Sequence, residues 1–308
     1  MSNLPILITG SNGLLGQKLV KLFLKKNIPF LATSQGSNRN PDCPDEYYQS
    51  LDVTDSEAIE LLFANKCFRA VIHTAAMTNV DQCETDRFGC DKLNVEATKL
   101  LWTVCKAHDI HFQLLSTDFI FDGEKGNYNE DDTPNPLSYY GQSKVKAEQL
   151  LVNDPNENWS IIRTIIVYGV AHNMSRKNLV LWAMDAIPKG EEMRIVNDQF
   201  RAPTWADDLA LGCWLAIEKR AKGIFHISGS ETKSVFDWVV TVGRHFGWST
   251  ENVKPIASST LNQAAKRPPK TGFNLNKANK VLGYKPRRME EVLDQLAEEL
   301  KFVQSTTL

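Results

Sequence analysis

The sequence feature that most constrains the fold is the stretch ITGSNGLLG at residues 8–16. The apolar run at residues 5–9 is typical of a buried strand, and leucines at helical spacing follow the three glycines. A strand, a glycine-rich turn and a helix in this order direct free backbone N–H groups and the positive end of a helix at a pyrophosphate. The glycines are spaced G-x-x-G-x-x-G rather than in the commoner G-x-G-x-x-G pattern, so a plain tight turn remains the alternative.

Strand-like and helix-like runs continue to alternate over the first 167 residues. Strands are expected at residues 28–33, 51–53, 70–76, 111–115 and 159–167, and helices after residue 54, around 94–106 and from Tyr140 onward. This alternation predicts an α/β fold with a Rossmann-like, doubly wound parallel sheet. Beyond about residue 168 the pattern changes, with helices expected at 178–187, 234–246 and 289–303 and a strand at 223–228. We therefore expect a nucleotide-binding domain at residues 1–167 and a smaller α/β substrate domain at 168–308, with some segments of the latter returning to the first sheet.

The end of the second expected strand bears on which dinucleotide binds. The carboxylate that would hold a ribose 2′-hydroxyl is missing there, and Ser34 stands in this region with Arg39 close behind. An arginine without a carboxylate favours a 2′-phosphate, so the sequence predicts NADP(H), with NAD(H) as the alternative. Asp52 lies where a side chain can reach an adenine edge, and residues 54–57 form a capping box for the next helix.

A tyrosine and a lysine four residues apart, Tyr140 and Lys144, share one face of their helix. A free phenol has a pKa of about 10, and a nearby ammonium lowers that pKa toward neutrality, which general acid–base chemistry requires. Just upstream, the strand at 111–115 delivers Thr117 to the carboxyl edge of the sheet, where open parallel sheets bind ligands. Such Tyr–Lys pairs also occur on solvated helix faces, so the glycine-rich turn and Thr117 are what favour catalysis.

Three further features have ordinary explanations. Residues 121–136 are rich in Gly, Asn, Asp and Pro, which is typical of an active-site loop or of a plain surface excursion. His73 lies inside an apolar strand and is expected to be an internal packed histidine. Arg163 also lies inside an apolar run, so we expect it to have a structural ion-pair partner.

Charge and cysteine content argue against several classes of function. The net charge of the 308-residue chain is -2 and no long basic run occurs, so no nucleic-acid partner is expected. The six cysteines include no C-x-x-C pair, which favours reduced thiols, and no metal site is predicted. We find neither a secretion signal nor an apolar run of membrane-spanning length, so we expect no membrane partner and a cytoplasmic location.

Six segments of the chain belong to a recognisable pattern. They are ITGSNGLLG at 8–16, HTAAMTNVDQCE at 73–84, LLSTDFIFDG at 114–123, NPLSYYGQSK at 135–144, NDQFRAPTWADDLA at 197–210 and KRPPKTGFNLNKA at 266–278. Together they resemble the extended short-chain dehydrogenase/reductase family and, within it, the dTDP-4-dehydrorhamnose reductases. The resemblance implies NADPH-dependent reduction of the C4 keto group of a nucleotide-linked 4-keto-6-deoxyhexose.

The resemblance also implies roles for individual residues. Catalysis would involve Thr117, Tyr140 and Lys144, with Lys144 also holding the nicotinamide ribose. The residues implied for cofactor binding are Gly10, Asn12, Gly13, Leu14, Gly16, Ser34, Arg39, Asp52, Val53, Ala75, Ala76 and Thr78, together with Tyr140 and Lys144. The residues implied for nucleotide-sugar binding are Thr117, Asn178, Arg201 and Arg267. A guanidinium suits a diphosphate, although a structural role for the two arginines is an equal alternative.

One position departs from the reductase group. Those reductases carry a tryptophan near the sugar after the sixth strand, whereas this chain has Ile166, which leaves the reaction type unchanged and the sugar open. The alternatives are a nucleotide-sugar epimerase or dehydratase of the same superfamily, a non-catalytic regulatory NADP-binding subunit resembling the methionine adenosyltransferase β-subunit, and a structural or redox-sensing nucleotide binder. The expected partners are a nucleotide-sugar and, as an alternative to a monomer, a second copy of the chain in a homodimer.

Overall fold

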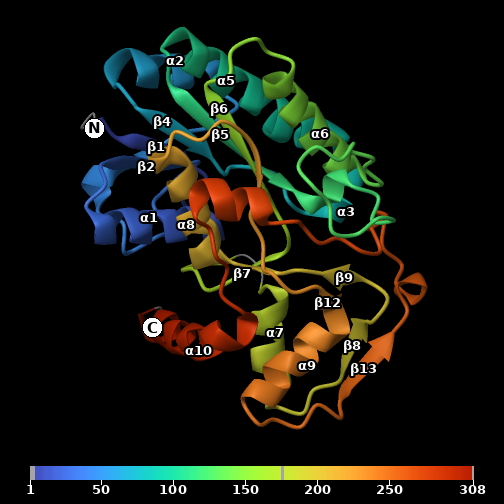
Figure 1. Ribbon diagram of the computed structural model, residues 1–308. Coiled ribbons are helices and arrows are strands. Elements are labelled where there is room, and N and C mark those ends of the chain that lie inside the picture. Colours follow the sequence, from blue (N-terminus) through green and yellow to red (C-terminus); the bar gives the residue numbers. More distant parts are fainter. Residues whose placement is uncertain (1–3, 175–176, 307–308) are drawn as a thin grey trace.

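The computed structural model describes residues 4–174 and 177–306, and at its centre is a seven-stranded parallel sheet (Figure 1). The strands are β1 (Ile6–Thr9), β2 (Phe30–Ser34), β3 (Tyr48–Ser50), β4 (Ala70–His73), β5 (His111–Thr117), β6 (Trp159–Thr164) and β11 (Gly223–His226). Their order is β11-β6-β5-β4-β1-β2-β3, so the direction of winding reverses between β1 and β4. Ligands of open parallel sheets bind at the carboxyl ends of the strands beside such a switch point. The predicted α/β fold with a Rossmann-like sheet is confirmed.

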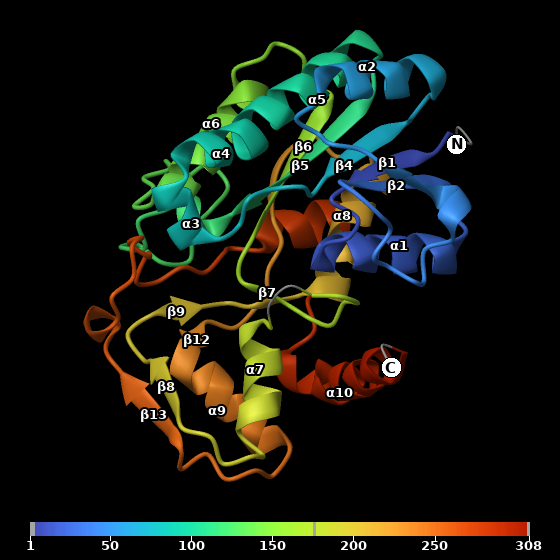
Figure 2. The ribbon, with the colours of Figure 1, turned by 180° about the vertical axis from the view of Figure 1, so that it is seen from behind.

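Helices cover both faces of the sheet, because neighbouring apolar side chains of a strand point to opposite sides. In β1, Ile6 and Ile8 pack with α1 (Leu14–Lys26) and α8 (Ala206–Glu218), whereas Leu7 packs on the other face. All three β1 side chains are fully buried. The second face is covered by α2 (Ser56–Asn65), α5 (Ala97–Ala107) and α6 (Tyr139–Val152), as Figures 1 and 2 show.

Part of the second half of the chain returns to this sheet. The edge strand β11 pairs in parallel with β6, from Gly223 beside Ser160 to His226 beside Arg163. Helix α8 precedes β11 and packs against α1. The sheet and its cover therefore draw on both halves of the sequence.

The remaining C-terminal segments form a second apolar core, at the bottom of Figure 1. Helices α7 (Leu179–Ala186), α9 (Val235–His245) and α10 (Met289–Thr306) pack there around Trp205 and Trp238. Three two-stranded ladders accompany them: β7 (Val167–Tyr168) with β10 (Thr204–Trp205), β8 (Met193–Val196) with β13 (Val253–Ile256), and β9 (Phe200–Arg201) with β12 (Lys233–Ser234). The short helical segments are α3 (Val80–Thr85), α4 (Arg87–Asp91), η1 (Asp45–Tyr47), η2 (Lys92–Glu96), η3 (Asp118–Ile120), η4 (Ser258–Thr260) and η5 (Ala278–Leu282).

Several predicted boundaries are wrong. The third strand, expected at 51–53, is β3 at Tyr48–Ser50, and the strand expected at 70–76 ends at His73. Two further differences have a clear local cause. The capping box at residues 54–57 would make Thr54 the cap, but α2 is capped by Asp55, and Thr54 donates its hydroxyl to Asp52 at 2.8 Å. The strand expected at 159–167 stops at Thr164, because the backbone turns at Ile166, where φ is 21°. In both places a local bond or turn overrides the periodic pattern.

Arg163 in β6 has the structural partner that the sequence predicts. Its Nε and Nη2 donate to the two carboxylate oxygens of Glu148 at 3.0 and 2.7 Å, and both side chains are buried. Its Nη1 donates to the Glu130 carbonyl at 3.0 Å. Because Glu148 lies on α6 and Glu130 within residues 121–136, the guanidinium attaches that loop to the sheet and to α6.

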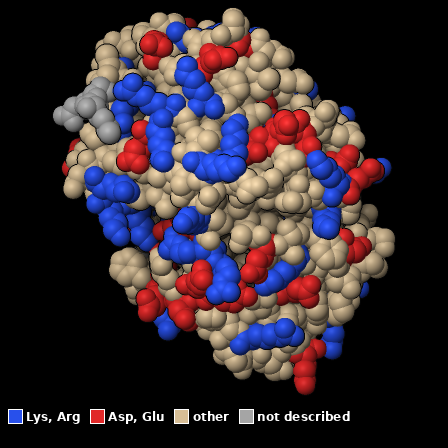
Figure 3. All heavy atoms as spheres, viewed as in Figure 1, with Lys and Arg blue, Asp and Glu red and all other residues tan. Residues whose placement is uncertain are grey.

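The surface mixes charges of both signs. On the face shown in Figure 3, Lys and Arg side chains are interspersed with Asp and Glu side chains. Within residues 4–174 and 177–306, no helix is both long enough and apolar enough to cross a membrane. All six cysteines are unpaired, and five of them are buried while Cys67 is exposed, which confirms the prediction of mostly buried thiols.

Candidate active site

The glycine-rich turn between β1 and α1 leaves a helix N-terminus without a side-chain cap. Gly10 has a φ of 70°, and a Cβ there would lie 2.7 Å from the Ala75 nitrogen. A Cβ at Gly16 would lie 2.4 Å from the Gly10 carbonyl oxygen, so only glycine allows the helix to start this close to the turn. Gly13 provides no side-chain hydrogen bond to α1, and the first turn of α1 has no acidic residue. Such an N-terminus suits a pyrophosphate.

Asn12 in the same turn fixes the loop that follows β2. Its N–H donates to Ser34 Oγ at 3.1 Å, its Nδ2 donates to the Ser37 carbonyl at 2.9 Å, and its Oδ1 accepts from the Arg39 N–H at 2.8 Å. The Arg39 carbonyl accepts from Asn173 Nδ2 at 3.0 Å. The Arg39 side chain is exposed, and within the described residues its guanidinium has no hydrogen bond or ion pair. An unpaired cation on a fixed backbone fits the predicted 2′-phosphate.

The other residues predicted for cofactor binding lie around the same edge of the sheet. Asp52 follows β3, and its Oδ2 accepts from Gln35 Nε2 at 3.1 Å. Ala75, Ala76 and Thr78 follow β4, next to the glycine-rich turn. Of the remaining side chains, Val53 is buried, Leu14, Ala75 and Ala76 are half-buried, and Thr78 is exposed.

Thr117 and Tyr140 meet at the carboxyl end of β5. A Cβ at Gly141 would lie 2.2 Å from the Phe119 carbonyl oxygen, so glycine in the first turn of α6 lets this helix approach η3. The approach brings the Tyr140 phenol near Thr117, whose hydroxyl acts to lower the pKa of the phenol. The Tyr140 ring lies against Phe119, with ring centroids 5.8 Å apart. Both Thr117 and Tyr140 are buried.

Burial raises the pKa of the Tyr140 phenol, and the hydrogen bond with Thr117 acts in the opposite direction. The expectation that Lys144 lowers this pKa is wrong, because desolvation dominates and Lys144 is not among the main influences. Tyr140 is therefore a neutral phenol that keeps the proton a general acid must donate.

Lys144 lies one turn further along α6 and is almost fully buried. Within the described ranges, its ammonium has no hydrogen bond or ion pair. Burial lowers the pKa of Lys144 to about 8, while the charge of Glu148 raises it. The pKa of His73 falls to about 3, mainly through burial and then through the Lys144 charge. His73 shares a hydrogen bond of 2.8 Å with Thr9 Oγ1, as expected for an internal histidine. A buried cation without a partner suits polar ligand groups.

Asn94 is a site residue without a sequence signal, because its role depends on a π-helical turn, η2. Its Nδ2 donates to Ser143 Oγ at 3.0 Å and to the Met77 carbonyl at 3.1 Å, and its Oδ1 accepts from the Met77 N–H at 2.8 Å. Ser143 lies between Tyr140 and Lys144 on α6. Asn94 therefore fixes the segment after β4 against the helix that carries the two catalytic candidates, and π-helical turns are frequent at functional sites.

Arg201, predicted to contact the substrate, is fully buried and bonded to backbone. Its Nη1 donates to the carbonyls of Phe200 and Pro269 at 2.7 and 3.2 Å, and its Nη2 donates to that of Pro268 at 2.5 Å. Its Nε lies 3.8 Å from Asp118 Oδ2. These contacts support the structural alternative for Arg201, so its contact with substrate is not supported.

Arg267 is paired with Asp81 in α3, the short helix that follows β4. Its Nη2 and Nη1 donate to Asp81 Oδ2 and Oδ1 at 2.7 and 3.2 Å, and the Ala265 N–H donates to the same carboxylate at 3.0 Å. Asn178 caps α7 and donates its Nδ2 to the Gly169 carbonyl at 2.7 Å. Neither contact excludes a ligand, because Arg267 is partly exposed and its carboxylate partner can be exchanged.

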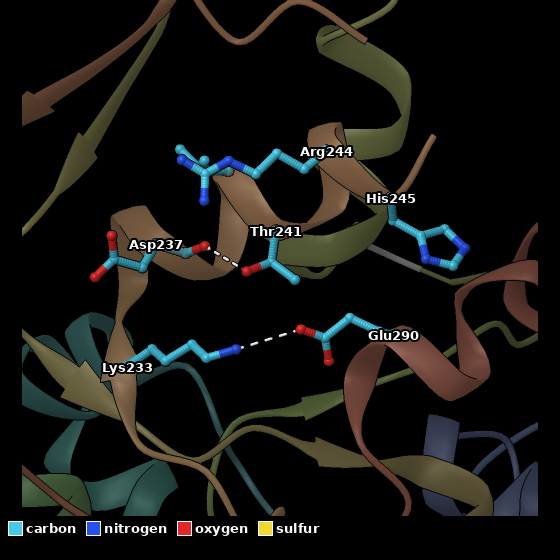
Figure 4. A pocket seen from close by; sticks show the side chains of 7 residues that line it. Lys233, Asp237, Thr241, Arg244, His245 and Glu290 are labelled. Atoms are coloured by element: carbon cyan, nitrogen blue, oxygen red, sulfur yellow. Dashed lines mark hydrogen bonds and ion pairs between the residues drawn. The ribbon is translucent and has the colours of Figure 1, made fainter. Parts of the chain in front are cut away.

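A separate cavity of about 520 Å³ lies between α9 and the start of α10 (Figure 4). Its lining comprises Lys233, Asp237, Val240, Thr241, Arg244, His245 and Glu290. Lys233 Nζ reaches across it to Glu290 Oε1 at 3.3 Å. The lining includes none of the residues predicted for cofactor or substrate.

A family comparison covers almost the whole chain. The model of the family described as RmlD substrate binding domain matches residues 4–302. The chain is also 28% identical over 293 residues to the probable low-salt glycan biosynthesis reductase Agl14 of Haloferax volcanii, covering 94% of this chain and 96% of that protein.

Two further proteins are similar over most of their length. The structure of dTDP-4-dehydrorhamnose reductase from Bacillus anthracis in complex with NADP has a TM-score of 0.80 and 25% identity, covering 97% of this chain and 100% of that one. Subunit beta of methionine adenosyltransferase 2 from Bos taurus is 27% identical over 272 residues, covering 86% of this chain and 79% of that protein. The first is a reductase and the second is a subunit of a methionine adenosyltransferase. Similarity alone is therefore compatible with two kinds of function.

Proposed function

The chain belongs to the RmlD substrate binding domain family, and from this premise we propose that it reduces the C4 keto group of a nucleotide-linked 4-keto-6-deoxyhexose with NADPH. At the coarser level it is an NAD(P)H-dependent oxidoreductase with the fold of the extended short-chain dehydrogenases/reductases. The observation that carries the proposal is the burial of Thr117 and Tyr140 at the carboxyl end of β5, with the buried Lys144 one helical turn further along α6.

The residues at the sheet edge fit a dinucleotide. The uncapped start of α1 suits the pyrophosphate, Arg39 the 2′-phosphate, and Lys144 the hydroxyl groups of the nicotinamide ribose. The reduced nicotinamide, when bound, supplies a hydride for the keto carbon. The chain itself contributes binding, orientation and a proton.

In the proposed mechanism, Tyr140 donates its phenolic proton to the keto oxygen as negative charge develops there. Its raised pKa keeps the phenol protonated until that point. Thr117 hydrogen-bonds the same oxygen and orients it, which stabilises the developing alkoxide. The Lys144 ammonium, one helical turn further along α6, would hold the hydroxyl groups of the nicotinamide ribose.

For the substrate, Arg267 is the best-placed cation, since it is partly exposed and faces a carboxylate rather than backbone carbonyls. A diphosphate would replace Asp81 in a bidentate contact with this guanidinium. Asn178 stays a proposed substrate residue. The sugar, the nucleotide base, a homodimer and a cytoplasmic location are further proposals.

A spectrophotometric screen of NADPH oxidation with dTDP-, UDP- and GDP-linked 4-keto-6-deoxyhexoses tests this function. We expect stoichiometric NADPH consumption with one nucleotide series and formation of the 4-hydroxy sugar. An epimerase or dehydratase would convert the sugar without net consumption of NADPH. Tight NADPH binding with no conversion of any ketosugar would contradict the reductase assignment.

The second candidate is a regulatory NADP-binding subunit, favoured by the 27% identity to subunit beta of methionine adenosyltransferase 2. Against it stands the presence of Thr117, Tyr140 and Lys144 together, because a binding subunit needs no proton donor. Association with a methionine adenosyltransferase catalytic subunit, measured by size-exclusion chromatography and combined with a negative ketosugar screen, would favour this candidate.

A further inference from the structure

Asp118, the residue directly after Thr117, carries a carboxylate that is fully buried beside the candidate catalytic pair. Its Oδ1 accepts from the Thr117 hydroxyl at 3.2 Å, and its Oδ2 accepts from the Thr271 hydroxyl at 2.5 Å. The two oxygens thus have separate hydroxyl donors. Thr117 belongs to the end of β5, whereas Thr271 comes from the C-terminal part of the chain.

The negative charge of Asp118 is balanced by Arg201, whose Nε lies 3.8 Å from Asp118 Oδ2. Arg201 is itself held by the carbonyls of Phe200, Pro268 and Pro269, so its guanidinium has little freedom to move. Both charged side chains are almost completely inaccessible to solvent. A buried pair of this kind is costly to break, because removing one partner leaves the other charge uncompensated.

The Thr117 hydroxyl has one hydrogen and two hydrogen-bond neighbours. The Phe119 N–H donates to Thr117 Oγ1 at 3.2 Å, so this neighbour supplies a hydrogen of its own. The other neighbour, Asp118 Oδ1, accepts the Thr117 hydrogen at 3.2 Å. A carboxylate is a stronger acceptor than a phenol. The hydrogen of the Thr117 hydroxyl is therefore directed to Asp118 and away from the Tyr140 phenol.

We propose that Asp118, held by Arg201 and Thr271, is a positioning residue that fixes the direction of the Thr117 hydroxyl beside Tyr140. The significance for catalysis rests on the proposed function. Asp118 does not touch the reacting atoms and gains or loses no proton in the reaction. Its effect is preorganisation: Thr117 serves the keto oxygen only after its hydroxyl rotates, and Asp118 determines how easily it does so.

An NMR titration tests the orientation without any substrate. The protein is labelled with ¹³C at the aspartate Cγ. The signal of Asp118 is identified as the one that disappears in the Asp118→Asn variant. Thr117→Val removes a donor to the Asp118 carboxylate, so we expect the pKa of Asp118 to rise, as it should in Thr271→Val. The control Thr241→Val, whose hydroxyl bonds to the Asp237 carbonyl in α9, should leave it unchanged. An unchanged Asp118 pKa in Thr117→Val would overturn the proposal.

A double-mutant cycle tests the consequence for catalysis. With the ketosugar identified by the screen, Asp118→Asn should lower kcat about tenfold, roughly the effect of one misdirected hydrogen bond. The dissociation constant of NADPH, measured by fluorescence, should stay within about twofold. In a Thr117→Val background, Asp118→Asn should cause no further loss of kcat. Equal losses in both backgrounds would mean that Asp118 does not act through Thr117, and the proposal would be wrong.

A charge-neutral variant separates positioning from stability. Asp118→Asn with Arg201→Gln removes both charges of the buried pair, keeps an amide donor for the carbonyls that Arg201 contacts, and should recover part of the thermal stability lost in Asp118→Asn alone. Its kcat should stay low, whereas recovery of kcat together with stability would reduce Asp118 to a structural role. If the wild-type protein turns over no ketosugar, the proposed function fails, and the NMR titration still decides whether Asp118 orients Thr117.

Discussion

The cofactor side and the substrate side of the site differ in what their cations already bind. Within the described residues, Lys144 and Arg39 have no hydrogen bond or ion pair through their charged groups, whereas Arg267 and Arg201 both face carboxylates. An unpaired cation is ready for a ligand, while a paired one must first exchange its partner. In terms of the proposed function, the cofactor would meet a pre-formed site and the nucleotide-sugar would bind by exchange.

The largest expected effect lies where the two sides meet. Tyr140→Phe removes the proton donor and should lower kcat about 10³-fold, while the NADPH dissociation constant changes less than about twofold. Stopped-flow turnover and fluorescence titration measure the two quantities. The matched control is Tyr139→Phe, whose hydroxyl bonds to Asp91 at 2.7 Å and which should keep kcat within about twofold. Equal activity of Tyr140→Phe and wild type would remove the phenol from the mechanism.

A pH profile tests whether the unpaired Lys144 acts as a cation. Burial lowers its pKa to about 8, so the ammonium is present below this pH and is lost as the pH rises through it. We expect kcat/KM to fall above about pH 8, approaching tenfold per pH unit. In Lys144→Arg, the guanidinium stays protonated, so the fall should disappear even if the rate is lower. A decline at the same pH in both proteins would assign it to another group.

Replacing Arg39 tests whether this unpaired cation binds the 2′-phosphate of the cofactor. Arg39→Leu should weaken NADPH binding about tenfold, or ~1.4 kcal/mol, and leave NADH binding nearly unchanged, because only NADPH carries the 2′-phosphate. Isothermal titration calorimetry with both cofactors measures this. Arg194→Leu, an exposed arginine on β8, is the matched control and should alter neither affinity. A parallel loss of NADPH and NADH affinity would place Arg39 elsewhere in the site.

The smallest effect is expected on the substrate side. Asp81→Asn weakens the hold on Arg267 and should lower the KM for the nucleotide-sugar up to about fivefold, since a half-exposed ion pair contributes ~1 kcal/mol at most. Initial-rate kinetics at saturating NADPH measures KM, and kcat should stay constant. The exposed Asp45→Asn serves as control. A higher KM in Asp81→Asn would mean that the pair builds the substrate site instead of competing with it.

The sequence predicts the parts of the fold that rest on local patterns. The strand, glycine-rich turn and helix at residues 6–26 lie within about twenty residues and are encoded by spacing, so they are found where expected. Cap choice at Asp55 and the break at Ile166 depend on single hydrogen bonds or turns, which periodicity does not resolve.

The candidate site is predictable only where one segment carries it. Tyr140 and Lys144 share a helix, and Thr117 ends a strand, so their types and spacing identify them. The bond between Thr271 and Asp118 joins residues 153 positions apart, and the contact between Arg267 and Asp81 spans 186 positions. No sequence pattern records such pairings, and the raised pKa of Tyr140 is likewise a product of burial in the folded chain.

Because Gly141 has no side chain, this position sets how closely α6 can approach η3 at the site. The helix α6 comes so near to the Phe119 carbonyl that even one methyl group would force the two apart. That displacement would carry the phenol away from the threonine while leaving both residues chemically intact. A substitution of Gly141 that abolished activity would therefore act by moving the reactive groups apart, although every one of them would still be present.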